Sequence, residues 1–521
     1  MKHHHYLLIF CFLTNIFSTK AQEVKVYKAP AFQPEWTKPT IQPDRIIINY
    51  GQDPASQANV TWRTNAEVKT SFAEIALATA APRFWRNAKT LRAKTEIMDA
   101  TAIEGANVLS HHHSVEFKGL LADTIYAYRV GDGEHWSEWF QFRTASKDLK
   151  KRFSFLYVGD AQNYILELWS RLIRQGFKTA PDAGFIVHAG DLINRAHLEQ
   201  DWHEWFYAGD FIHSMLPAFP TPGNHEYRGK TKAEEDSGRK SLSVQWRPHF
   251  TLPQNGPSAH PELAETVYYM DYQDMRIISL NSNTKQEEQI PWLEKVLANN
   301  SKKWTVITFH HPLFSASEGR NNDRLRNLWK PVFDKYKVDL VLQGHDHSYA
   351  RGRVSPGENV IDGINLRDQT GTVYVVSVSG GKMYNIGEDW TKLGADRERI
   401  GENTQLFQVV TIEGDRLRFE SYTAIGELYD AFELVHSGDA PNKFIELRAN
   451  AVPEKYHSNT ISYQDPLPEK IKTILLQRYP EYRITNVNAT EQAGKIFFNI
   501  KLKKGDAEIN TKVDLLGNEV K

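Results

Sequence analysis

Five apolar runs of the sequence each end in side chains that can bind a metal ion. In chain order these side chains are Asp160, Asp191, Asn224 with His225, His310 with His311, and His345 with His347. The set contains carboxylates, a carboxamide and imidazoles but no thiolate, a combination that suits Zn, Mn or Fe. Because the donors exceed what one tetrahedral site holds, the sequence favours two metal ions.

The elements that position these residues follow from hydrophobic periodicity. The apolar runs alternate with amphipathic segments, which we expect to be helices, at Leu166 to Gly176 and Asp323 to Tyr336. Such alternation is typical of sheets covered by helices. In open sheets of this kind, ligand sites form beyond the carboxyl ends of the strands, so the separate loops are expected to meet in one cleft.

Strand geometry predicts which neighbours act together. Residues two apart on a strand share a face, so Asp160 pairs with Gln162, and His345 pairs with His347 while Asp346 points away. Gln162 is therefore a further candidate ligand.

The segment before this region predicts a different domain. Short alternating runs between about Asp44 and Thr144, separated by Gly, Pro, Asn and Asp, suit a roughly seven-stranded antiparallel sandwich. Trp62 would be a core ring, and Tyr126 would pin a strand corner. No cluster of acids, bases or nucleophiles appears here, which indicates a packing module.

The end of the chain predicts a third unit. A polar stretch at residues 437–465 is expected to be a linker. From Pro466 an amphipathic helix is followed by three strand-like runs, which predict a small α+β domain.

The beginning of the chain has the pattern of a secretory signal peptide at residues 1–21. Lys2 precedes an apolar run, and Ala21 supplies the small residue at the cleavage position. The single cysteine, Cys11, lies in this segment, so cleavage excludes disulfides, thiolate metal sites and a cysteine nucleophile. A lipoprotein anchor on Cys11 is the alternative, but the bulky Phe10 disfavours it. We expect a periplasmic or secreted protein without a transmembrane segment.

Composition excludes other classes of function. Lys and Arg total 63 against 64 Asp and Glu, which argues against nucleic-acid binding through a broad basic face. A hydrophobic content of 40% is enough for packed cores. The sequence has no "GxSxG" elbow, which disfavours a serine hydrolase. The oligomeric state is left open.

The ordered series "GD", "GD", "GNHE", "HHP" and "GHDH" resembles the calcineurin-like metallophosphoesterases. The preceding sandwich, which is fibronectin III-like, narrows the resemblance to the purple acid phosphatase-like branch. The tail is weakly similar to PepSY domains. The resemblance implies a multidomain protein with an antiparallel β-sandwich at residues 43–145, a central α/β (αββα) catalytic domain at 153–436 and an α+β domain at 466–521.

The resemblance also implies a role for each candidate residue. Asp191 would bridge two ions, His225 would face the substrate as the acid, and His311 would be a pocket residue. The first ion would be held by Asp160 and His347, and the second by Asn224, His310 and His345. The implied activity is acid phosphatase-like hydrolysis of small phosphate esters, monoesters rather than diesters, by in-line attack of a dimetal-bound hydroxide.

This sequence departs from the resemblance at the first ion. The purple enzymes have "GDxxY", whose tyrosinate binds ferric iron, but the corresponding residue here is Asn194. Other members place a histidine where this chain has Gln162. Either carboxamide could supply a neutral oxygen, with Gln162 preferred on strand period. A divalent first ion and an absence of purple colour are therefore expected.

Two further questions stay open at this point. Arg320 follows "HHPLFSASEG" in a polar loop, where it either clamps a phosphate or is a solvated loop charge. The alternative function is a binding or regulatory protein that has lost its metals and uses the sandwich and the tail. The completeness of the ligand set, including the acid candidate His225, argues for an enzyme.

Overall fold

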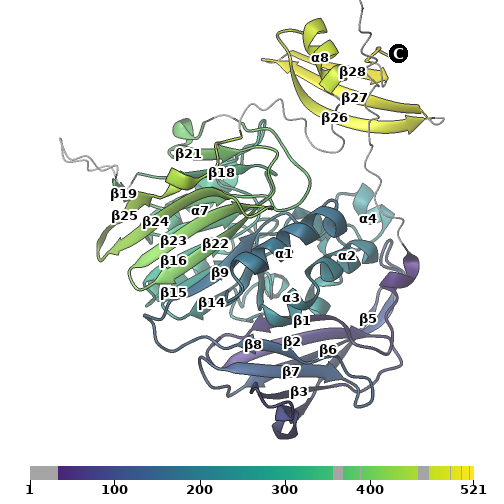
Figure 1. Ribbon diagram of the computed structural model, residues 1–521, viewed down its shortest axis with the longest axis vertical. Helices are drawn as coiled ribbons and strands as arrows, with labels where there is room; N and C mark the ends of the chain where they lie inside the picture. Colours follow the sequence, from purple (N-terminus) through teal and green to yellow (C-terminus); the bar gives the residue numbers. More distant parts are fainter. Residues whose placement is uncertain are drawn as a thin grey trace, which may run out of the picture.

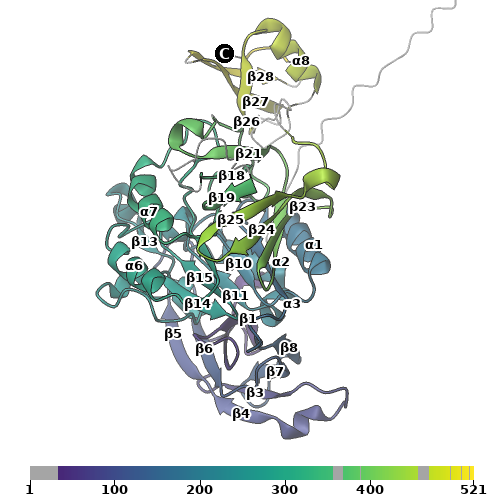
Figure 2. The ribbon, with the colours of Figure 1, turned by 90° about the vertical axis from the view of Figure 1, so that its left-hand side faces the viewer.

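The computed structural model describes residues 33–355, 368–387, 389–455, 467, 469–492, 495–505, 507–514 and 517–520. The predicted signal peptide at residues 1–21 lies outside them. The described chain forms a sandwich, a central domain and a C-terminal domain, which follow one another along the long axis of the molecule (Figures 1 and 2). Within the described residues, no helix has the length and hydrophobicity that crossing a bilayer requires.

The N-terminal sandwich consists of two four-stranded antiparallel sheets, ordered β1-β2-β6-β5 and β4-β3-β7-β8. Trp62 is fully buried between them, and the Tyr126 hydroxyl accepts a hydrogen bond from the Leu121 nitrogen at 2.8 Å, as a strand-corner tyrosine does. The strands are β1 (Asp44–Tyr50), β2 (Gln57–Thr64), β3 (Phe72–Leu77), β4 (Lys89–Arg92), β5 (Lys94–Asp99), β6 (Leu109–Lys118), β7 (Ile125–Gly131) and β8 (Phe140–Arg143), with 3-10 turns at Pro34–Thr37 and Phe84–Asn87.

The sequence indicated about seven strands, and the additional one has a local cause. A mostly exposed run passes from one sheet to the other at Ala93, so its first part is β4 beside β3 and its second part is β5 beside β6. Edge strands with so little burial give a weak hydrophobic signal.

The central domain has two mixed sheets. The first is ordered β11-β10-β9-β22-β23-β24-β25-β19 and the second β14-β15-β16-β17-β20-β18-β21. Strands β9, β10 and β11 are parallel to one another, as are β15, β16, β17 and β20. Buried residues of α1 share a core cluster with the first sheet, and those of α6 and α7 with the second, which gives the expected αββα layers (Figures 1 and 2).

The elements of the central domain run as follows. The first sheet is built from β9 (Phe153–Val158), β10 (Ile186–His188), β11 (Ala218–Pro220), β19 (Gln369–Thr370), β22 (Leu406–Glu413), β23 (Arg416–Thr423), β24 (Leu428–Ser437) and β25 (Ala440–Glu446). The second is built from β14 (Tyr268–Tyr272), β15 (Met275–Ser279), β16 (Trp304–Thr308), β17 (Leu340–Gln343), β18 (Tyr349–Arg353), β20 (Val373–Val376) and β21 (Asp396–Gly401). A short pair, β12 (Tyr227–Arg228) and β13 (Ser241–Leu242), stands apart.

The helices of the central domain are α1 (Ser170–Thr179), preceded by a π-helical turn at Ile165–Trp169, α2 (Glu199–Gly209), α3 (Phe211–Met215), α4 (Lys232–Asp236), α5 (Trp246–His249), α6 (Ile290–Ala298) and α7 (Asp323–Lys335). The two amphipathic segments in the sequence are thus helical. Short 3-10 turns occur at Asn224–Glu226, Pro261–Leu263, Thr391–Leu393 and Arg448–Asn450.

The predicted linker at residues 437–465 is wrong in its first part. Strand β24 runs to Ser437, and β25 pairs with it antiparallel. The strand was missed because Phe444 is its one buried side chain, packed 5.3 Å from Phe432 between ring centroids. The central domain therefore extends to Glu446, and residues 456–466 lie outside the described chain.

The C-terminal domain is α+β, as expected. Helix α8 (Glu469–Arg478) precedes the antiparallel strands β26 (Arg483–Gln492), β27 (Lys495–Lys504) and β28 (Ala507–Asp514). Ile471 and Leu475 of the helix share a buried cluster with Phe498 and Val513 of the sheet.

Candidate metal centre

The candidate ligands follow the carboxyl ends of parallel strands from both sheets. Asp160, Asp191 and Asn224 come shortly after β9, β10 and β11 of the first sheet. His310 and His345 come shortly after β16 and β17 of the second. The face-to-face packing of the two sheets therefore brings these strand ends to one site.

The ligand atoms form two overlapping clusters. Asp191, His310 and His345 offer ligand atoms within 4.8 Å of one another, and so do Asp160, Asp191 and His347. Asp191 belongs to both. Two cations that share one carboxylate are the arrangement that fits this donor set.

The backbone at these ligands is unusual. Asp160, Asp191, His345 and His347 all have positive φ angles, of 51°, 52°, 73° and 43°. Non-glycine residues avoid this region, and such conformations gather at functional sites. The strand alternation expected at these residues is absent. Strands β9 and β17 end at Val158 and Gln343, so left-handed turns, rather than strand alternation, direct these side chains.

His310 is held so that one ring nitrogen faces the other ligands. Its Nδ1 donates to the Ala189 carbonyl at 2.9 Å. Its Nε2 lies 3.0 Å from Oδ1 of Asn224, 3.1 Å from Nδ1 of His345 and 3.1 Å from Oδ2 of Asp191. Asn224 therefore lies in the same cluster as His310 and His345.

The electrostatics show that this site needs positive charge. Burial lowers the pKa of His310, but the charges of Asp191 and Asp160 outweigh it and raise that pKa to about 9. Burial raises the pKa of Asp160. Burial also opposes ionisation of Asp191, yet His310 and His225 hold its pKa below the usual range. Two buried carboxylates so close together are stable as anions only beside cations.

The structure separates the two carboxamides proposed for the first ion. Gln162 is buried, and its Nε2 lies 2.7 Å from Oδ2 of Asp191 and 3.0 Å from Nε2 of His347. Its Oε1 is buried without a hydrogen-bond partner in the described chain. Asn194 instead uses its backbone carbonyl to accept from Nδ1 of His225 at 2.6 Å. The Gln162 amide thus lies against Asp191 and His347 of the cluster that also contains Asp160, and its oxygen has no partner in the described chain.

Three predicted substrate-facing residues surround the clusters. His225 is part-exposed and its Nε2 lies 4.0 Å from Asp191, while the bond to Asn194 occupies Nδ1. The Nδ1 of His311 contacts Oγ of Ser282 at 2.8 Å.

Arg320 lies at the rim of the site. Its Nη1 donates to the His345 carbonyl at 3.0 Å and lies 3.4 Å from Oδ1 of Asp346. The guanidinium also lies over the ring of Tyr384, 4.8 Å from the centroid. Arg320 is therefore not a freely solvated loop charge.

Sequence reasoning missed Glu226. Its buried carboxylate accepts hydrogen bonds from the backbone nitrogens of Asp191 at 2.9 Å, Gly223 at 2.6 Å and Leu192 at 2.8 Å. It joins the turns after β10 and β11. The sequence feature that could have indicated Glu226 is its position in the motif "GNHE". The glycine of that motif is needed for close approach, because a Cβ at Gly223 would lie 2.2 Å from Oδ1 of Asp191.

Asp346 was expected to point away from the ligands, and it does so for a structural purpose. Its Oδ2 accepts from the backbone nitrogen of Ala316 at 2.5 Å, and Oδ1 contacts Arg320. Burial raises the pKa of Asp346 to about 6, which Arg320 opposes. It therefore fastens the Arg320 loop to the turn that carries His345 and His347.

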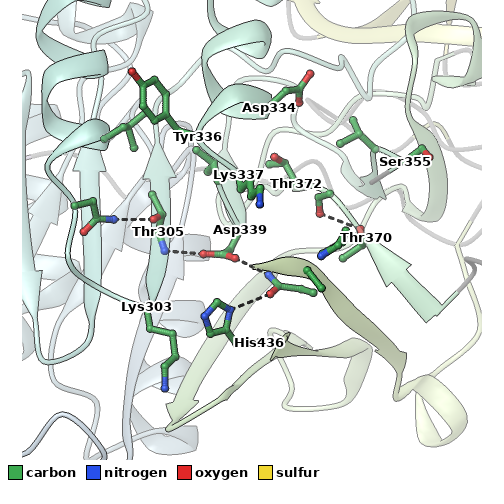
Figure 3. Close-up of a pocket in the computed structure, with 18 of the residues that line it drawn as sticks. Lys303, Thr305, Asp334, Tyr336, Lys337, Asp339, Ser355, Thr370, Thr372 and His436 are labelled. Carbon is green, nitrogen blue, oxygen red and sulfur yellow. Dashed lines mark hydrogen bonds between the residues drawn. The ribbon is translucent and has the colours of Figure 1, made fainter. Parts of the chain in front are cut away.

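A separate cavity of about 850 Å³ lies at the opposite, amino-terminal ends of β16 and β17. Figure 3 shows Asp339 there, accepting from the Thr305 nitrogen at 2.7 Å and from Nδ2 of Asn442 at 2.5 Å. None of the predicted site residues lines this cavity. Its polar groups connect the two sheets.

Comparison with known proteins identifies two domains. Residues 43–144 match the family described as purple acid phosphatase, N-terminal domain, and residues 153–349 match the calcineurin-like phosphoesterase family. The first match covers the sandwich, and the second includes all the candidate ligands.

Individual relatives are distant. An uncharacterized protein of Mycobacterium tuberculosis is 26% identical over 396 residues, 64% of this chain and 69% of its own length. The Fe(3+)-Zn(2+) purple acid phosphatase 12 of Arabidopsis thaliana is 26% identical over 299 residues, 54% of this chain and 61% of its own. The structure of a purple acid phosphatase from yellow lupin seeds superimposes with a TM-score of 0.62 at 19% identity, covering 80% of this chain and 78% of that one, which shows a common fold.

Proposed function

Because the chain combines a purple acid phosphatase N-terminal domain with a calcineurin-like phosphoesterase domain, we propose that it is an exported, dimetal phosphatase that hydrolyses small phosphate monoesters. The observation that carries the proposal is the position of Asp191 in both ligand clusters. A shared carboxylate at the carboxyl ends of two packed sheets is what a pair of ions acting on one phosphoryl group requires.

We assign the ligands from these contacts. Asp191 would be shared by the two ions. Asp160, His347 and, with its amide turned so that Oε1 faces the site, Gln162 would hold the first ion. Asn224, His310 and His345 would hold the second. When bound, the cations supply an acidified water for in-line attack and positive charge for the phosphoryl oxygens. The neutral Gln162 in place of a tyrosinate favours a divalent first ion, and Mn, Zn or ferrous iron fits these ligands.

His225 is the proposed acid for the leaving group. The Asn194 carbonyl accepts from Nδ1, so this bond fixes the ring and leaves Nε2, which lies 4.0 Å from Asp191, without a hydrogen bond in the described chain. A protonated Nε2 there can deliver its proton to a departing alkoxide.

Arg320 is the proposed phosphate clamp. Its Nη1 makes the contacts to His345 and Asp346. Its Nη2 and Nε form no hydrogen bond among the described residues. Two donors of the planar guanidinium are thus available for the terminal oxygens of a monoester. His311 completes this wall of the pocket.

Export follows from the N-terminal pattern. We propose cleavage after Ala21 and release to the periplasm or the exterior. Mass spectrometry of the N-terminal peptide of the mature protein tests this, and a mature chain that retains Cys11 with a lipid would contradict it.

The central experiment compares metal content and turnover. Purified protein is stripped by a chelator and reloaded with Mn, Zn or ferrous iron, and a panel of phosphate mono- and diesters is tested with each. Asp191→Ala and Asn224→Ala should abolish hydrolysis and lower metal content while the fold survives. Asp182→Ala, on an exposed ion pair with Arg152, is the matched control. Near wild-type turnover in either ligand variant would overturn the assignment.

A further inference from the structure

A second cavity lies directly beside the candidate metal centre. It measures about 690 Å³ and shares Asn224 and His311 with that centre. The rest of its lining comes mainly from residues 282–286 and 321–325, with Tyr227 and Lys240. A phosphoryl group at the metals would therefore place the remainder of its ester in this cavity.

Three amide side chains in the lining have a fixed orientation. Nδ2 of Asn283 donates to the Pro222 carbonyl at 2.9 Å, Nε2 of Gln286 to the Ser282 carbonyl at 2.7 Å, and Nδ2 of Asn322 to the Pro312 carbonyl at 2.7 Å. Because a carbonyl oxygen can only accept, the nitrogen of each amide must face it. The amide oxygens are then the ends left for a ligand.

Two of these oxygens, Oε1 of Gln286 and Oδ1 of Asn322, accept no hydrogen bond within the described chain and are not among its fully buried polar atoms. Oδ1 of Asn283 also accepts none, but it is fully buried and out of reach of a ligand. Next to it, the Thr284 hydroxyl makes no hydrogen bond among the described residues. A ligand hydroxyl can donate to these open oxygens, whereas an apolar group would displace water from them without replacing its hydrogen bonds.

Charge contributes little to this lining. Arg324 pairs with Glu287 at 3.2 Å, and Asp323 pairs with Arg326. Lys240 is exposed at the edge. The inner wall is thus neutral and rich in hydrogen-bond acceptors.

We propose that this cavity binds the leaving group of the substrate and selects uncharged, hydroxyl-rich groups, so that monoesters of sugars and polyols are preferred. The inference rests on the proposed phosphatase function. A leaving group with hydroxyls bonds to the oxygens of Gln286 and Asn322 and to the Thr284 hydroxyl, whereas an alkyl group leaves these groups without a partner. A second anionic group would face amide oxygens and is disfavoured.

The test uses a matched pair of substrates on the metal-loaded, full-length enzyme. Glycerol 1-phosphate and 1-propyl phosphate have the same carbon skeleton and differ in hydroxyl groups. We expect wild type to prefer the glycerol ester by roughly tenfold or more in kcat/KM, because a site built for hydroxyls rejects analogues that lack them. Glucose 6-phosphate extends the comparison to a sugar.

Two variants test which side chains cause the preference for the glycerol ester. Thr284→Val is isosteric and breaks no internal side-chain bond, and Gln286→Leu removes an amide oxygen that is open to the cavity. Each should reduce the preference several-fold, while the metal content stays at the wild-type level. Thr90→Val in the sandwich is the matched control.

The outcomes are distinct. Equal kcat/KM for the two esters in wild type, or an unchanged preference in Thr284→Val and Gln286→Leu, would overturn the inference while the phosphatase assignment stands. A preference for glucose 1,6-bisphosphate that is lost only in Lys240→Ala would also overturn it, in favour of charge recognition. Failure to hydrolyse any ester with any metal would refute the proposed function itself.

Discussion

The carboxylate of Glu226 fixes the backbone of Asp191, the residue that both ligand clusters share. Oε2 accepts the Asp191 N–H at 2.9 Å, and the same side chain accepts the backbone N–H groups of Gly223 and Leu192. Glu226 does not belong to either cluster, so it acts by positioning. Such supporting residues typically change metal affinity or activity without being ligands.

Glu226→Gln should therefore weaken metal binding or turnover by roughly 10- to 100-fold, because the new NH2 group faces backbone N–H donors. Metal titration and kcat are the measurements. Glu294→Gln, on the exposed side of α6, is the control. Wild-type metal affinity and kcat in Glu226→Gln would show that the carboxylate has no positioning role.

Gln162 should be the residue that replaces the tyrosinate of the purple enzymes. Gln162→Leu is expected to lose most of one metal equivalent by elemental analysis, whereas Asn194→Leu keeps it, because only Gln162 lies against Asp191 and His347. Iron-loaded wild type should show no visible charge-transfer band. The appearance of such a band would contradict this assignment, and Asn194→Tyr tests whether one can be introduced.

His225→Ala should separate substrates by their leaving groups. Alkyl phosphate hydrolysis should fall by about 10²- to 10⁴-fold, because an alkoxide needs protonation, while p-nitrophenyl phosphate hydrolysis falls far less. The comparison is of kcat/KM for the two esters. Equal losses on both would remove His225 from the acid role.

The C-terminal domain should influence the site through Glu318, in the same loop as Arg320. Glu318 pairs with Arg483 and lies 3.8 Å from Nζ of Lys503, both in the C-terminal domain. Part-exposed pairs of this kind contribute about 0.5–1 kcal/mol, so Glu318→Ala should raise KM about two- to fivefold. Glu481→Ala, which removes a pair with Lys504 inside that domain, is the control. Equal KM values in wild type and Glu318→Ala would exclude this coupling.

Asp339 should make stability depend on pH. Burial raises its pKa from 3.8 to about 6, so the folded protein holds the proton that the unfolded chain releases first. Asp339 therefore makes its full contribution to the free energy of unfolding below about pH 4. This contribution, at most about 3 kcal/mol, is lost as the pH rises through 6.

Thermal unfolding of wild type and Asp339→Asn between pH 4 and 7 measures the effect. The melting temperature of wild type should fall relative to that of Asp339→Asn as the pH rises. A difference that stays constant over this range would refute the shift at Asp339.

Sequence alone determined which elements form and which residue types end them. Period-2 alternation gave the sandwich, including Trp62 and the hydrogen-bonded Tyr126, and apolar runs with amphipathic helices gave the central layers. The signal failed where burial is slight. β25 buries one side chain, Phe444, so its sequence could not be distinguished from a linker.

The tertiary structure decided how the candidate ligands group. Periodicity could pair Asp160 with Gln162, but only the left-handed turns at Asp160, Asp191, His345 and His347 bring residues from two sheets together. Glu226 and Asp346 acquired roles for the same reason, since their partners are backbone groups that lie far away in sequence. Local patterns record burial along one segment, whereas a site depends on distances between segments, and packing alone sets those distances.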